Sequence, residues 1–216
     1  MPVKYYPVCL DISNRKCVVV GGGDVAERKV LHLLECGAAV DVVGMTLTDA
    51  LKTMAGSGRI GWIEAPYEDR FLEGAFLAIG ATDRTEVNRR VYEDARKRGI
   101  LVNVVDVPAC CDFIVPSVVR RGDLTVAVST GGRSPALAKK IREDLETRYG
   151  PEYSDFLRIM GKIREKIVGS GKGSESNRRV FEEILRSPLL ECIREGRWDD
   201  ARKLVREYVG EDVSLD

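Results

Sequence analysis

The chain has 216 residues, in which 34 lysine and arginine side chains balance 34 aspartate and glutamate side chains. This length suits one domain of ordinary size with a smaller partner. The zero net charge argues against a nucleic-acid or membrane-surface protein, and no apolar run approaches the roughly 20 residues of a membrane span. The amino-terminal residues lack the apolar core of a signal peptide, so we expect a cytoplasmic protein.

A glycine-rich turn follows the first predicted strand. Residues 17–20 read as a buried strand, residues 21–23 are all glycine, and a helix then continues to Gly37. Glycines let a pyrophosphate approach the backbone, and the unpaired N–H groups of a helix start attract it. With Ala26, the spacing fits the G-x-G-x-x-G/A fingerprint of dinucleotide-binding units. An ordinary tight turn between strand and helix is the alternative.

The second predicted strand, residues 38–43, ends without the usual ribose-binding side chain. An acidic residue at this point is typical of NAD sites and an arginine of NADP sites, but here the strand runs into Gly44, Met45 and Thr46. The absence of an arginine favours NAD, with ribose contacts from backbone groups or the Thr46 hydroxyl. The residues expected to bind the cofactor are Gly21, Gly22, Gly23, Asp24, Val25, Met45, Thr46 and Thr82.

Strand and helix signals go on alternating as far as about residue 112. The further predicted strands are residues 60–64, 76–81 and 101–105, and an amphipathic helix is predicted at 85–99. This alternation predicts an α/β fold with a doubly wound, parallel, Rossmann-type sheet. Ligands of such sheets collect at the carboxyl ends of the strands. Polar groups stand at three of these ends: the glycine turn, residues 81–83 and residues 103–106.

The pattern changes after Pro108. Residues 113–116 and 123–128 read as two strands around a turn at 120–123. Ser134 suits a helix N-cap and Pro135 the first helical position, so the glycines before them mark either a second anion site or an ordinary capped helix.

The part of the chain beyond Pro151 reads as wholly helical, with a flexible loop at residues 169–174. The single histidine, His32, is expected on a helix surface. The six cysteines form no C-x-x-C pair and are expected to be reduced. A structural role is favoured for Cys110 and Cys111 over a redox or metal-binding one, and we expect no metal site.

Several motifs, taken together in this order, resemble the siroheme synthase amino-terminal family. They are VVGGGDVAERK, NVVD followed by a proline, FIVPS, RGDLTVAVSTGG and SPALAKKIREDLE. The resemblance covers residues 1–150 and continues more loosely through the helical tail. It implies a stand-alone form, without the family's fused methyltransferase domain. The implied parts are an NAD-binding Rossmann domain (1–112), a small α+β dimerisation segment (113–149) and a helical domain (150–216).

The same resemblance implies an activity, NAD-dependent dehydrogenation of the tetrapyrrole precorrin-2 to sirohydrochlorin. Asp106 is then the base that takes the departing proton, with NAD as the hydride acceptor. Thr130 and Arg133 are the expected substrate contacts, and the protein is expected to be a homodimer. Insertion of Fe²⁺ into sirohydrochlorin stays open, because some relatives also have this ferrochelatase activity. An NAD-sensing module without turnover and a purely structural role are the alternatives.

Overall fold

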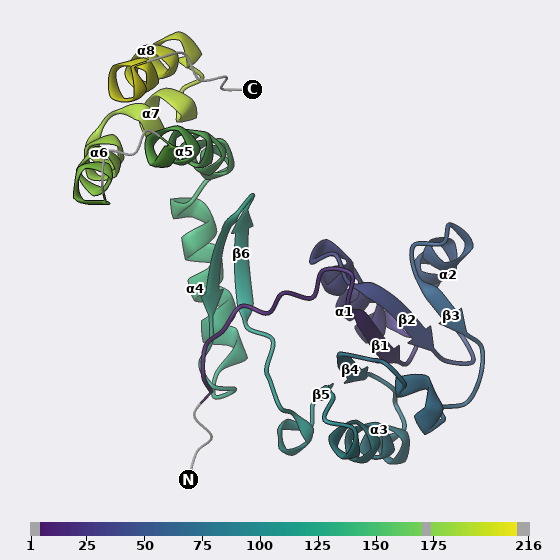
Figure 1. Cartoon of the computed structure of the whole chain (residues 1–216). Helices are drawn as coiled ribbons and strands as arrows, with labels where there is room; N and C mark the ends of the chain where they lie inside the picture. Colours follow the sequence, from purple (N-terminus) through teal and green to yellow (C-terminus); the bar gives the residue numbers. More distant parts are fainter. Residues whose placement is uncertain (1–4, 170–173, 211–216) are drawn as a thin grey trace. The chain divides into compact units, whose positions relative to one another are not determined.

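The computed structural model describes residues 5–169 and 174–210, and the chain divides into two compact units (Figure 1). They are Met1–Val115 and Pro116–Asp216. The first unit holds five parallel strands in the order β3-β2-β1-β4-β5. The strands are β1 (Lys16–Val20), β2 (Ala39–Val43), β3 (Gly61–Ile63), β4 (Leu77–Gly80) and β5 (Leu101–Val104). The predicted Rossmann-type sheet is confirmed.

Helices flank this sheet. The α-helices are α1 (Asp24–Glu35), α2 (Asp49–Gly56) and α3 (Thr85–Lys97), and the short 3-10 turns are η1 (Asp69–Leu72) and η2 (Pro108–Cys110). Val19 packs in one apolar cluster with Val30 of α1, whereas its neighbour Val18 packs in another with Val91 of α3. Successive side chains of a strand point to opposite faces, so a continuous apolar run marks a strand that is buried on both.

One cysteine of this unit lies in its interior. Cys17 on β1 is fully buried, and burial raises the pKa of its thiol to about 11. All six cysteines lie within the described residues, and none of them forms a disulfide. His32 is exposed on α1, as the sequence predicts.

The second unit begins with an antiparallel hairpin. Its strands are β6 (Ser117–Arg121) and β7 (Leu124–Val128), joined at Gly122, whose φ is +56°. The strand predicted at 113–116 is therefore wrong. Pro116 has no N–H to give to a strand ladder, and the carbonyl of Phe113 instead accepts a hydrogen bond from Asn103 Nδ2 at 2.9 Å.

Helices make up the rest of the second unit. They are α4 (Pro135–Arg148), α5 (Glu152–Gly169), α6 (Ser174–Arg186), α7 (Leu189–Arg194) and α8 (Trp198–Val209). The Ser134 hydroxyl accepts a hydrogen bond from the Leu137 N–H, which confirms the predicted N-cap of α4. Ile159, Ile163, Ile184 and Leu189 form the buried centre of the helices α5 to α8.

Most of the predicted loop at 169–174 lies outside the described residues. Among the helices that the structure describes, none is long and apolar enough to cross a membrane.

Candidate functional site

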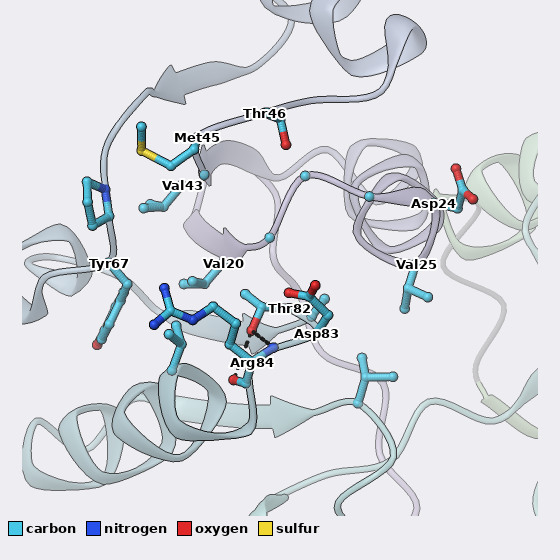
Figure 2. A pocket seen from close by; sticks show the side chains of 18 of the residues that line it. Val20, Asp24, Val25, Val43, Met45, Thr46, Tyr67, Thr82, Asp83 and Arg84 are labelled. Atoms are coloured by element: carbon cyan, nitrogen blue, oxygen red, sulfur yellow. Dashed lines mark hydrogen bonds between the residues drawn. The ribbon is translucent and has the colours of Figure 1, made fainter.

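A cavity of about 600 Å³ lies at the carboxyl ends of the strands in the first unit (Figure 2). Its walls come from the loops that follow all five strands. They include residues 20–25, 43–46, 65–67, 81–84, 87, 105 and 106. The three polar strand ends that the sequence singles out thus line one cavity, as expected for an open α/β sheet.

The three glycines of the turn meet different surroundings. A Cβ on Gly21 would overlap the Ala81 carbonyl oxygen, and a Cβ on Gly22 would overlap that of Thr46. Gly21 also has a φ of +122°, which strains any other residue. A Cβ on Gly23, by contrast, would meet nothing within 4 Å. The protein's own packing explains the first two glycines, whereas the third leaves space open at the start of α1.

That open space faces a helix start. The α1 ladder begins with the Glu27 N–H donating to the Gly23 carbonyl at 3.0 Å, so the N–H groups of residues 24–26 precede the first intrahelical bond. Figure 2 shows the Asp24 carboxylate turned away from Thr46 and Thr82. The arrangement suits a pyrophosphate, because the space, the N–H groups and the positive end of the helix dipole coincide.

Hydrogen bonds fix the loop after β2 against this turn. The Thr48 N–H donates to the Gly22 carbonyl at 2.9 Å, and the Thr48 hydroxyl donates to Glu27 Oε2 at 2.5 Å. Met45 and Thr46, which precede Thr48, are exposed and line the cavity. Thr48 therefore holds the two predicted ribose contacts in place, a role that sequence reasoning missed.

A buried asparagine shapes the loop after β4. Asn88 on α3 is only 7% exposed. Its Oδ1 accepts from the Thr82 hydroxyl at 2.8 Å and from the Thr82 N–H at 3.1 Å, and its Nδ2 donates to the Thr82 carbonyl at 2.8 Å. These bonds satisfy a buried polar group, and Thr82 is held as part of the cavity wall.

Asp106 stands just beyond β5 in an unusual backbone conformation. Its φ is +61°, in the left-handed region that costs an L-residue roughly 1–2 kcal/mol. The turn is closed by the Val107 N–H, which donates to the Val104 carbonyl at 3.3 Å. The exposed carboxylate lines the cavity that the glycine turn also lines. Strain of this kind is found at functional sites.

Two ionisable side chains surround this turn. Burial lowers the pKa of the half-buried Lys29 on α1, while the negative charge of Asp106 opposes that fall. Burial raises the pKa of the Cys111 thiol, and its sulfur lies 3.2 Å from the Val104 carbonyl oxygen. Cys111 thus contributes to the packing of the turn that presents Asp106.

Comparison with known proteins agrees with this geometry. A family model described as putative NAD(P)-binding matches residues 8–117, and a second, sirohaem biosynthesis protein central, matches residues 121–148. The chain belongs to the siroheme synthase amino-terminal family. The cofactor class of its first unit is a nicotinamide dinucleotide.

Siroheme synthases are similar over nearly the whole chain. That of Nitrosococcus oceani is 38% identical over 199 residues, 92% of this chain and 42% of the relative. That of Nitrosospira multiformis is 39% identical over 215 residues, 97% of this chain and 45% of the relative. The chain thus spans less than half the length of these curated relatives.

One solved structure shares the fold of both units. "SirC, precorrin-2 dehydrogenase" has a TM-score of 0.79 and 27% sequence identity, and the match covers 94% of this chain and 100% of that one.

The two predicted substrate residues of this family member belong to the second unit. The Thr130 hydroxyl accepts a hydrogen bond from the Ser134 N–H at 3.1 Å, so it holds the loop before α4. Gly131 and Gly132 adopt positive φ values of 61° and 81°, and the Arg133 side chain is exposed beside them.

Sequence reasoning did not single out Pro66, Tyr67 and Arg84, whose side chains come from loops and line the cavity. Tyr67 is buried, and its hydroxyl donates to Asp94 Oδ2 at 3.3 Å. Burial and the Asp94 charge raise the pKa of Tyr67. Periodicity gives no signal for these residues, because loop side chains reach the cavity only through the tertiary fold.

Proposed function

We propose that the chain is an NAD-dependent precorrin-2 dehydrogenase that forms sirohydrochlorin in siroheme biosynthesis. One observation carries the proposal: the glycine turn and Asp106 line the same cavity. A single cavity then contains both a binding site for a dinucleotide and a carboxylate that can act as a base. The names of the similar proteins, siroheme synthase and precorrin-2 dehydrogenase, support the substrate class.

The residues present fit the cofactor. The open space at Gly23 and the N–H groups of Asp24 and Val25 would hold the pyrophosphate, with Gly21 and Gly22 shaping the turn. Met45 and Thr46 would contact the adenosine ribose, and Thr82 would form part of the opposite wall. NAD is proposed over NADP because the end of β2 carries no arginine for a 2′-phosphate.

Asp106 would supply the base. Dehydrogenation removes a hydride and a proton from the tetrapyrrole, and bound NAD supplies the hydride acceptor. The proton passes to the Asp106 carboxylate, which is exposed to the cavity. A positioned base of this kind contributes about 10²–10⁴-fold to a rate. The left-handed turn is the feature that holds this carboxylate at the end of β5.

The second unit would contribute substrate contacts and a dimer interface. Arg133 is an exposed cation beside two glycines, which suits the binding of a substrate carboxylate. We propose Thr130 as a second substrate contact. Leu137 and Ile141 of α4 are 51% and 37% exposed. Large apolar residues exposed at helical spacing suit a symmetric contact with a second copy.

Anaerobic incubation with precorrin-2 and NAD tests the proposed function. We expect the absorbance of sirohydrochlorin to grow at a rate proportional to the protein concentration. Tight NAD binding with no turnover of precorrin-2 would instead identify an NAD-sensing module.

A further inference from the structure

One arginine, Arg84, lies in the wall of the cavity. Among the described residues that line it, Arg84 is the only cation, in the company of Asp24, Asp83 and Asp106. The Arg84 N–H and carbonyl bond to the Thr82 hydroxyl. Within the described part of the chain, its guanidinium forms no ion pair or hydrogen bond, and the residue is exposed.

The strand order indicates which half of a dinucleotide reaches which part of the cavity. The glycine turn follows β1, in the middle of the sheet, and Asp106 follows β5 at one edge. The reacting ring has to lie on the Asp106 side if this carboxylate takes the proton. The adenosine half then extends the other way, toward the loops after β2 and β3 that carry Met45 and Tyr67.

The Arg84 side chain reaches that adenosine side. Figure 2 shows it running from the loop after β4 toward Tyr67, below Val43, while the Asp83 carboxylate points another way. Two contacts fix the position of Tyr67: the Arg90 guanidinium lies 5.7 Å from its ring centroid, and Asp94 accepts a hydrogen bond from its hydroxyl. Among the described residues, no hydrogen bond, ion pair or ring contact fixes the Arg84 guanidinium elsewhere.

We infer that Arg84 binds the adenosine half of the cofactor, with its planar guanidinium lying against the adenine ring. A guanidinium is flat, delocalised and weakly hydrated, so it stacks on aromatic faces where a lysine ammonium does not. The exposed thioether of Met45 and the ring of Tyr67 give the same part of the cavity an apolar character, which suits a purine. The inference rests on the proposed function for the identity of the cofactor and for the role of Asp106, which sets the orientation of the cofactor in the cavity.

The binding of three ligands to four proteins tests this role. The ligands are NAD, NADP and ADP-ribose, and their dissociation constants are measured by calorimetry. The proteins are the wild type, Arg84→Ala, Arg84→Lys and, as a matched control, Arg89→Ala. Arg89 is exposed on α3, pairs with Glu93 at 2.8 Å and does not line the cavity. Thermal unfolding of each variant checks that the fold is intact.

We expect Arg84→Ala to weaken all three ligands by a similar factor of about five to ten, the range of a partly exposed cation–π contact. Arg84→Lys should restore little of the affinity, and Arg89→Ala should behave as the wild type. Weakening of NADP alone, with rescue by lysine, would overturn the inference and assign Arg84 to a 2′-phosphate. Unchanged ADP-ribose binding would also overturn it, since the contact would then be with the nicotinamide half.

Unchanged affinity for every ligand in Arg84→Ala would refute the inference while the proposed function stood. A wild-type protein that binds neither NAD nor NADP would instead remove the cofactor site, and with it both the proposed function and this inference.

Discussion

The two units of the chain differ in how completely they bury their apolar surface. The strand β1 is covered on both faces, and Cys17, Val18 and Val19 are fully buried. In α4, by contrast, Leu137 and Ile141 form an apolar stripe at helical spacing, and they are 51% and 37% exposed. The residues that line the cavity all belong to the first unit. The Leu137 and Ile141 side chains leave apolar surface of α4 exposed, and this exposure is the observation behind the proposed dimer.

Replacement of the proposed base should give the largest effect. Asp106→Ala is expected to lose about 100-fold or more in the rate of precorrin-2 dehydrogenation, as for a positioned general base. NAD affinity, measured by titration, should stay within about twofold, since the turn that holds the pyrophosphate lies after another strand. Near-normal dehydrogenation by this variant would remove the catalytic role of Asp106.

Asp106→Gly is the matched variant for stability. Glycine tolerates the φ of +61° without the steric cost that aspartate bears, so this protein should unfold no more easily than the wild type while losing as much activity.

The same two variants, Asp106→Ala and Asp106→Gly, also test iron insertion. If Asp106 accepts pyrrole protons, both variants lose the insertion of Fe²⁺ or Co²⁺ into sirohydrochlorin. A wild type that never exceeds the uncatalysed rate of insertion is a dehydrogenase alone.

Two neighbouring glycines should separate folding from cofactor binding. Gly22→Ala drives a Cβ into the Thr46 carbonyl, and such overpacking costs typically about 1–3 kcal/mol of stability or more. Gly23→Leu meets open space, so the variant should fold but lose NAD affinity by about tenfold or more, equivalent to at least about 1.4 kcal/mol. Chemical denaturation and NAD titration measure the two effects. Unchanged affinity in a folded Gly23→Leu protein would contradict the pyrophosphate site.

The sequence predicts much of the first unit because its signals are local. Apolar runs mark the mostly buried strands β1, β2, β4 and β5, and three glycines in a row mark the turn. The spacing of the glycines does not show that the Thr46 carbonyl leaves no room for a Cβ at position 22. Nor does it show that a Cβ at position 23 would meet open space. The sequence also does not show that Asn88 of α3 is hydrogen-bonded to Thr82, because contacts between a helix and a loop depend on the tertiary fold.

The strand predicted at 113–116 is wrong for a related reason. The apolar residues 113–115 have the composition of a strand, but composition does not say which edge they pair with. The Asp112 N–H donates to the Val102 carbonyl at 2.8 Å and the Phe113 carbonyl accepts from Asn103. The start of this segment is therefore hydrogen-bonded to residues of β5, and the hairpin begins only after Pro116.

The buried thiol of Cys17 should make stability depend on alkaline pH. Burial raises its pKa from 9.0 to about 11, so the folded chain holds a proton that the unfolded chain releases. The stabilisation is complete below pH 9 and is lost as the pH rises toward 11, by about 3 kcal/mol at roughly 1.4 kcal/mol per pH unit. Denaturant unfolding over this range should show a shallower fall in Cys17→Ala. An equal slope in both proteins would refute the assignment.

The smallest expected effect concerns assembly, where a dimer and a monomer differ by a factor of two in mass. Light scattering of the wild type at micromolar concentration should report roughly twice the chain mass, since C₂ dimers are the commonest assemblies. Leu137→Glu places a charge on the exposed stripe of α4 and should give a monomer. Lys139→Glu, an exposed change on the same helix, is the control for added negative charge. A wild-type monomer with full activity would contradict the proposed dimer.

The central claim is that the glycine turn and Asp106 serve one reaction. The most direct test measures NADH and sirohydrochlorin together during a single anaerobic reaction of the wild-type protein with precorrin-2 and NAD. The account predicts that both products appear in equal molar amounts and that both disappear in Asp106→Ala. Sirohydrochlorin formed without NADH, or NAD bound with neither product formed, would contradict it.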